Sequence, residues 1–166
     1  LPSSGLGPWE AALESSPAFR LIRTCREGEA WQIAAGLYLG GHRPTVMLQS
    51  SGLGNSLNAL TSLVVPYKIP MLIVVANNRS FFNDELHQER VARIRSRPPE
   101  NRWIGQRISE PDIDLAGMAR SQGALGIGPV STLDDMHTAM KQAVAAAQEG
   151  KVVVIDARVA PGYDAD

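Results

Sequence analysis

The stretch that most constrains the fold is the apolar run MLIVVA at 71–76, which continues without a polar residue from Pro70 to Asn77. A strand with one face in water alternates apolar and polar residues, whereas a parallel strand covered on both faces is apolar throughout. The run is also far shorter than the roughly 20 residues that cross a bilayer. It therefore predicts a central parallel strand with helices on both faces of its sheet.

Segments of strand and helix character alternate along the chain on either side of this run. Strands are predicted at 19–24, 44–49, 70–76 and 151–159, with a weak strand at 124–128. Helices are predicted at 8–15, 27–41, 55–65, 84–95, 112–123 and 131–150, and the proline-rich segment 96–111 is expected to be an ordered loop or a mobile lid. This alternation predicts an α/β fold with a doubly wound, mostly parallel sheet and helices on both faces.

Composition fits one domain of ordinary type. A chain of 166 residues accommodates a single core, and its net charge of −1 gives no electrostatic reason to expect nucleic acid or an anionic membrane as a partner. No signal-peptide pattern is present at the amino end, so a cytoplasmic location is expected. The one cysteine, Cys25, is interpreted as a small residue at a strand end rather than as a nucleophile. No strand precedes the helix at 8–15, so either a strand is missing or the sheet begins one strand late.

Ligands of such folds bind beyond the carboxyl ends of the strands. The loops expected there are 25–27, 50–54, 77–83 and 160–163. The second of them, in QSSGLGNSLN, raises the question of phosphate binding because two glycines stand between a strand and a helix. It has no P-loop lysine, and Leu57 stands where the dinucleotide fingerprint needs a third glycine. What remains is an anion-binding turn, with a plain tight turn as the alternative.

A second polar cluster, ANNRSFFND, follows the central strand. Asn77 and Asn78 carry side-chain carbonyls, which are hard oxygen ligands suited to Mg²⁺ or Ca²⁺. Turn and helix-cap roles are the alternative for both residues. His42, His87 and the arginines at 90, 93 and 95 are interpreted as surface residues rather than substrate ligands.

With these motifs the chain resembles the thiamine diphosphate enzymes of the decarboxylase and acetolactate-synthase-like superfamily. Residues 20–70, with CREGEAWQIAAGLYLGG, resemble the pyrimidine-binding domain of sulfopyruvate and phosphonopyruvate decarboxylases. Residues 68–163, with MLIVVANNRSFFNDELHQERVAR and ENRWIGQRI, resemble the diphosphate-binding domain of acetolactate-synthase-like enzymes. The chain is therefore predicted to be a single thiamine diphosphate-binding domain over 1–166, or a composite with its junction near 66–76. A recombined chain and a piece of a longer one are both compatible with that interpretation.

The resemblance implies a role for individual residues. By this resemblance Glu27 is expected to be the catalytic glutamate that bonds the aminopyrimidine ring, whereas Glu29 is expected to point elsewhere on its helix. The resemblance also implies that the Asn78 side chain and the Ser80 backbone hold magnesium. Leu53, however, stands where the aspartate of the family's Gly-Asp-Gly turn would lie. The residues expected to bind the cofactor are Ser51, Gly52, Gly54, Asn55, Asn77 and Ser80.

The implied function is a carbon–carbon lyase that depends on thiamine diphosphate and Mg²⁺, in its simplest form a 2-oxo acid decarboxylase. The implied partners are a 2-oxo acid substrate and either further copies of the chain or a complementary subunit. Two alternatives stay open: a catalytically silent α/β domain of a thiamine diphosphate enzyme, and a phosphate-binding module. Leu53 favours the silent domain, because a leucine offers no charge to a metal-bound diphosphate.

Overall fold

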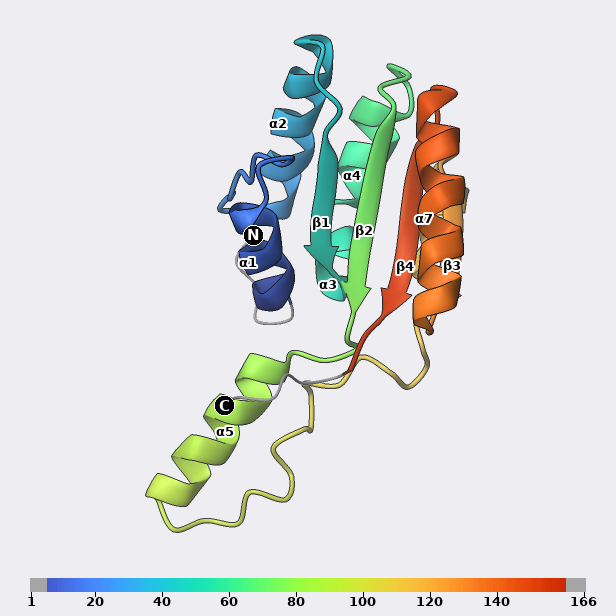
Figure 1. Ribbon diagram of the computed structural model, residues 1–166. Helices are drawn as coiled ribbons and strands as arrows, with labels where there is room; N and C mark the ends of the chain where they lie inside the picture. The colour runs from blue at the N-terminus through green and yellow to red at the C-terminus, as the bar shows by residue number, and fades with distance from the viewer. Residues whose placement is uncertain (1–5, 161–166) are drawn as a thin grey trace.

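The computed structural model describes residues 6–160, apart from the side chain of Pro8, and it places a parallel sheet at the centre of the molecule (Figure 1). Its strands within these residues are β1 (Thr45–Gln49), β2 (Met71–Asn77), β3 (Leu125–Val130) and β4 (Val152–Arg158). Their order across the sheet is β1-β2-β4-β3, and every pairing is parallel. All four strands therefore end at one edge, which we call the carboxyl edge.

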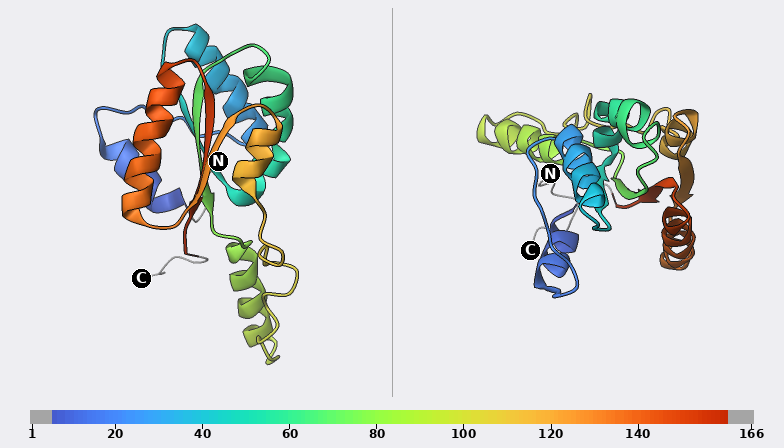
Figure 2. Two further views of the ribbon diagram at one scale, coloured as in Figure 1. Left: turned by 90° about the vertical axis from the view of Figure 1, so that its right-hand side faces the viewer. Right: turned by 90° about the horizontal axis from the view of Figure 1, so that it is seen from above.

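Helices cover both faces of the sheet (Figure 2). The bounds of the helices are α1 Gly7–Ser15, α2 Glu27–Leu39, α3 Ser50–Asn55, α4 Leu57–Ala59, the π-helix η2 Leu60–Val64, α5 Phe82–Ile94, α6 Leu115–Ser121 and α7 Leu133–Gln148. Successive residues of β2 divide between two cores: Ile73 and Val75 pack with α2, α3 and α6, whereas Leu72 and Val74 pack with α7. This alternation on a continuously apolar strand confirms the α/β prediction and the parallel sheet.

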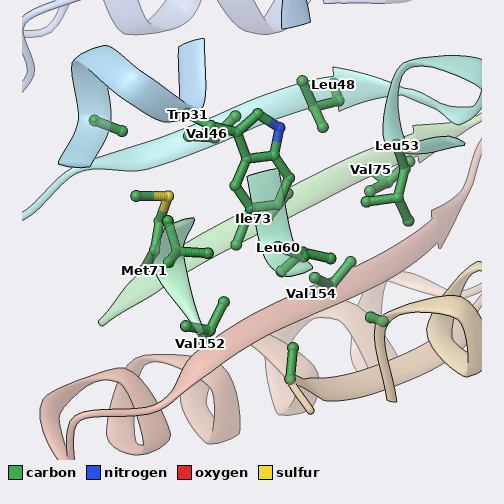
Figure 3. Packing of buried hydrophobic residues seen from close by; sticks show 14 of the residues in the cluster. Trp31, Val46, Leu48, Leu53, Leu60, Met71, Ile73, Val75, Val152 and Val154 are labelled. Atoms are coloured by element: carbon green, nitrogen blue, oxygen red, sulfur yellow. The ribbon is translucent and has the colours of Figure 1, made fainter. Parts of the chain in front are cut away.

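Trp31 of α2 lies at the centre of the larger core and is fully buried. Figure 3 shows its ring lying over the strands beside Val46 and Ile73. Its indole nitrogen donates to Ser56 Oγ at 2.9 Å, and that hydroxyl donates to the Gly52 carbonyl at 2.6 Å. A buried indole needs such a partner. The chain of bonds holds α3 against α2.

The prediction of a strand at 19–24 is wrong. This segment is irregular, and Phe19 and Ile22 are exposed. Arg23 explains the outcome, because its guanidinium pairs with Glu10 at 3.1 Å and with Glu14 at 2.9 Å, both on α1. The segment is thereby held against α1, and β1 forms the edge of the sheet.

The prediction of a turn at 50–54 is also wrong. Strand β1 passes into α3 at Ser50 with no intervening loop, so Gly52 and Gly54 are helical. The helix predicted at 55–65 is found as the short α4 followed by the π-helix η2. The other predicted strands and helices are found with shifted ends. Helix α6 is shorter than the predicted 112–123, because Asp114 caps it by accepting from the Gly117 amide at 2.6 Å.

Helix α5 and the irregular segment after it extend away from the carboxyl edge (Figure 1). Two backbone bonds tie the segment back to the start of the helix: Phe81 donates to Gln106 at 2.8 Å, and Ile108 donates to Arg79 at 2.8 Å. The predicted loop at 96–111 is thus confirmed as irregular. In residues 6–160 we find no helix with the length and apolar character needed to cross a membrane.

Candidate functional site

The carboxyl edge gathers polar side chains from three neighbouring strands. Gln49 ends β1, Asn77 ends β2 and is followed by Asn78, and Asp156 lies near the end of β4. Parallel pairing sets Val75 beside Asp156 and Asn77 beside Arg158. Polar groups that are separated by up to about a hundred positions in sequence therefore meet at the place where α/β proteins bind ligands.

Glu27 is the first residue of α2 and is half-buried against α3. A Cβ added to Gly52 would lie 2.9 Å from Glu27 Cγ and 3.2 Å from Oε1, so only glycine lets the glutamate lie this close to the helix. Asn55 Nδ2 donates to Glu27 Oε2 at 3.3 Å. The positive end of α2 favours a carboxylate at this position. The structure thus brings together three of the predicted site residues: Glu27, Gly52 and Asn55.

Three other predicted residues, Ser51, Gly54 and Asn77, line a cavity of about 290 Å³ next to α3. The other lining residues are Ser50, Phe81, Ile108, Ile113, Leu115 and Met118. The Ser50 hydroxyl is buried and has no hydrogen-bond partner among the described residues. No cation stands among the lining residues, so the cavity offers a diphosphate only hydroxyl and amide groups between apolar walls.

The predicted metal ligands Asn78 and Ser80 are buried and bonded within the protein. Gln49 Nε2 donates to Asn78 Oδ1 at 3.1 Å and to the Ser80 carbonyl at 3.2 Å. The Ser80 hydroxyl donates to Glu85 Oε1 at 2.5 Å. Within the described part of the chain, no group of three histidine, cysteine or acidic side chains is placed to hold a metal. The assignment of magnesium to Asn78 and Ser80 stays a prediction.

Leu53 does not face the carboxyl edge. Its side chain is fully buried in the core with Leu48, Val75 and Leu115. The position that resembles the family's metal-binding aspartate therefore serves packing, because α3 begins directly at the strand end and turns this residue inward.

Asp156 is a buried carboxyl that the sequence analysis missed. Only 1% of it is exposed, and Asn77 Nδ2 donates to its Oδ1 at 2.8 Å. Burial raises the pKa of Asp156; the Asn77 bond and the charge of Arg158 act in the opposite direction. An acid inside the apolar run VVVIDARV was the available signal. Asn77, which we predicted to bind cofactor, thus donates its amide to a structural carboxyl.

The predicted residues therefore share one edge but belong to three separate groups. Glu27 lies with Gly52 and Asn55, the cavity takes Ser51, Gly54 and Asn77, and the remaining two residues bond to Gln49. The individual roles stay predictions. Of the loop predicted at 160–163, only residue 160 lies among the described residues.

The family model that matches this chain is described as the C-terminal TPP binding domain of thiamine pyrophosphate enzymes, and it matches residues 29–157. The chain belongs to the thiamine pyrophosphate enzyme family. This result confirms the family resemblance. The match runs through both stretches that resemble different domains, and the composite interpretation with a junction near 66–76 stays a prediction.

Curated relatives of this family member are decarboxylases. A phosphonopyruvate decarboxylase of Streptomyces viridochromogenes is 35% identical over 140 residues, covering 84% of this chain and 30% of the relative. The alpha subunit of a sulfopyruvate decarboxylase of Methanococcus maripaludis is 48% identical over 56 residues, covering 34% of each chain. The chain thus spans about a third of the length of these relatives.

A solved structure shares the fold. The thiamine diphosphate-dependent 4-hydroxybenzoylformate decarboxylase of Rhodococcus jostii RHA1 superposes with a TM-score of 0.59 at 23% identity, over 84% of this chain and 24% of that one. The likeness supports the α/β architecture that the strand order defines.

The two glycines of α3 give a matched test of the Glu27 position. Gly54→Ala should stabilise the protein by about 0.5–1 kcal/mol through helix propensity, since the new methyl meets nothing closer than Met118 Cε at 3.9 Å. Gly52→Ala should fall short of that gain by roughly 1 kcal/mol, because Glu27 must leave its rotamer. Urea unfolding measures both variants. Equal gains would show that Glu27 does not rest on Gly52.

Asp156→Asn tests the buried carboxyl by its pH dependence. Because the folded pKa is raised, the folded state holds its proton more tightly than the unfolded state, and the stability of the parent falls as pH rises through that pKa. The amide variant still accepts from Asn77 and lacks this decline. Urea unfolding from about pH 4 to about pH 8 measures the free energy of unfolding of the variant and the parent. As pH rises, the variant should become increasingly more stable relative to the parent. A constant difference over that range would contradict the raised pKa.

Proposed function

We propose that this chain forms the pyrimidine-facing half of a thiamine diphosphate site in a 2-oxo acid decarboxylase, and that a second chain supplies the half that holds Mg²⁺ and the diphosphate. The observation that carries the proposal is the Glu27 carboxylate, which lies on the bare backbone of Gly52 and accepts from Asn55. Bound thiamine diphosphate supplies the electron sink for loss of carbon dioxide. The rest of the proposal concerns what the residues of this chain do.

Glu27 acts as the group that holds a proton against a ring nitrogen of the cofactor. It is the first residue of α2, and a carboxylate at this position can accept that proton. Asn55 donates to Oε2, and Oε1 lies against the bare backbone of Gly52. Gly52 and Asn55 thereby orient the carboxylate, and Ser51 and Gly54 form the neighbouring wall of the cavity.

Asn77 and Ser80 contribute to the site through other residues. Asn77 donates to Asp156 at 2.8 Å, and the Ser80 hydroxyl donates to Glu85. In the proposed site these bonds hold the backbone after β2 in place beside the cavity. Both residues therefore contribute to cofactor binding by keeping the cavity in shape.

The reaction class rests on the relatives. Phosphonopyruvate and sulfopyruvate, which the relatives decarboxylate according to their names, are both 2-oxo acids. Two relatives with 37% and 48% identity are named as alpha subunits, which supports a site completed by another chain. That chain is either a second copy of this one or a complementary subunit.

The main alternative is a catalytically silent domain of the same family. Leu53 favours it, since this side chain is buried in the core and a leucine offers no charge to a metal-bound diphosphate. A phosphate-binding module is not favoured, because the cavity walls are mostly apolar.

A comparison of Glu27→Gln with Glu29→Gln distinguishes the decarboxylase from the catalytically silent domain. Glu29 lies two residues further along α2, where its carboxylate accepts from the Cys25 amide at 2.8 Å, and glutamine can accept there equally well. With thiamine diphosphate, Mg²⁺ and either oxo acid, Glu27→Gln should lower turnover by about 10²-fold or more, while Glu29→Gln should match the parent. Turnover is measured for the chain alone and mixed with the complementary subunit of a sulfopyruvate decarboxylase.

The other outcomes are equally decisive. Similar turnover of the two variants would remove Glu27 from the mechanism. Binding of the cofactor in calorimetry with no turnover under either condition would establish the silent domain instead.

A further inference from the structure

Gln49 occupies the point on the carboxyl edge that a metal ion would need. It is the last residue of β1, and its amide nitrogen lies 3.1 Å from Asn78 Oδ1 and 3.2 Å from the Ser80 carbonyl oxygen. These are the two oxygens that the family resemblance assigns to Mg²⁺. Both residues are deeply buried, Asn78 with 3% and Ser80 with 2% exposed.

The amide fits this position better than a cation does. An NH₂ group carries two N–H donors and meets two acceptor oxygens at ordinary hydrogen-bond lengths. Mg²⁺ requires contacts of about 2.0–2.1 Å in a near-octahedral set that includes one or two carboxylates. Two neutral oxygens on either side of a bonded amide nitrogen supply no negative charge to a cation.

The carboxylates near this point have other partners. Glu85 accepts from the Ser80 hydroxyl at 2.5 Å and lies 3.7 Å from the Arg107 guanidinium. Asp156 accepts from Asn77, and the charge of Arg158 acts on it. Leu53 points into the core. The residues present therefore do not fit a magnesium ion.

We infer that the Gln49 amide replaces the metal ion in this chain, so that the segment after β2 takes its shape without a cation. The replacement has a consequence that rests on the proposed function. A second copy of the chain carries the same Gln49 and supplies no metal for a diphosphate. Between the two partners left open above, the complementary subunit of different sequence is the one that completes the site.

Gln49→Glu tests the inference with the metal alone. In metal-free buffer the new carboxylate faces two acceptor oxygens in place of a donor, and Tm should fall by roughly 3–10 °C. Added MgCl₂ or MnCl₂ should recover most of the lost Tm, because three oxygens with one negative charge now meet at this point. The parent should show no cation-specific change in Tm relative to KCl of equal ionic strength.

Gln142→Glu on the exposed surface of α7 is the matched control, since it makes the same chemical change far from the edge. It should behave as the parent does in both buffers. Gln49→Leu removes the amide without adding a charge, and its Tm should fall with no recovery in either salt. If Gln49→Glu does not fold, electron paramagnetic resonance of Mn²⁺ mixed with the parent protein gives a second measurement. The spectrum should show only the signal of free Mn²⁺.

Three results would overturn the inference. The first is Mn²⁺ binding by the parent that Asn78→Ala abolishes. The second is Gln49→Glu with an unchanged Tm in metal-free buffer. The third is a destabilised Gln49→Glu that neither cation restores. All of these measurements use the chain without thiamine diphosphate, so their failure is separate from a failure of the proposed decarboxylase.

Discussion

The parallel pairing of β2 with β1 on one side and β4 on the other determines where the polar groups of this molecule meet. Buried on both faces, β2 has a single register with each neighbour, in which Gln49 pairs with Ala76 and Asp156 with Val75. Glutamine, asparagine and aspartate side chains are thereby brought to one edge. Their hydrogen bonds to one another follow, because buried polar groups need partners.

The direct passage from β1 into α3 sets the character of the site. With no loop between strand and helix, three successive residues of α3 face different surroundings: Gly52 receives Glu27, Leu53 enters the core, and Gly54 lines the cavity. The bonds from Trp31 to Ser56 and from Ser56 to Gly52 hold this helix against α2. The same packing that positions the glutamate therefore takes away the residue that would carry a metal-binding carboxylate.

Much of this arrangement follows from sequence pattern, and the rest depends on contacts that a pattern does not contain. The run at 71–76 predicts β2 because burial on both faces leaves it wholly apolar. The segment 19–24 has strand-like spacing, yet Arg23 finds two glutamates on α1, which is a tertiary contact. Glycines at 52 and 54 suggest a turn, but here Gly52 makes room for Glu27 within a helix.

The candidate site divides in the same way. Glu27, Asn78 and Ser80 were predicted from the family resemblance, and the structure places them at or beside one edge. Gln49 was not found, because a polar residue at a strand end has no distinctive spacing, and its importance depends on which oxygens lie opposite. Asp156 was missed because its burial follows from the pairing of β4 with β2.

In the proposed function this chain recognises the pyrimidine end of the cofactor and leaves metal and diphosphate to another chain. Two-dimensional NMR of the side-chain amides of Asn55 and Gln49, with thiamine and thiamine diphosphate added separately, tests it most directly. Both compounds should shift the Asn55 signal equally, and Mg²⁺ should change neither this response nor the Gln49 signal. A Gln49 signal that moves with Mg²⁺, together with tighter binding of the diphosphate form, would contradict it.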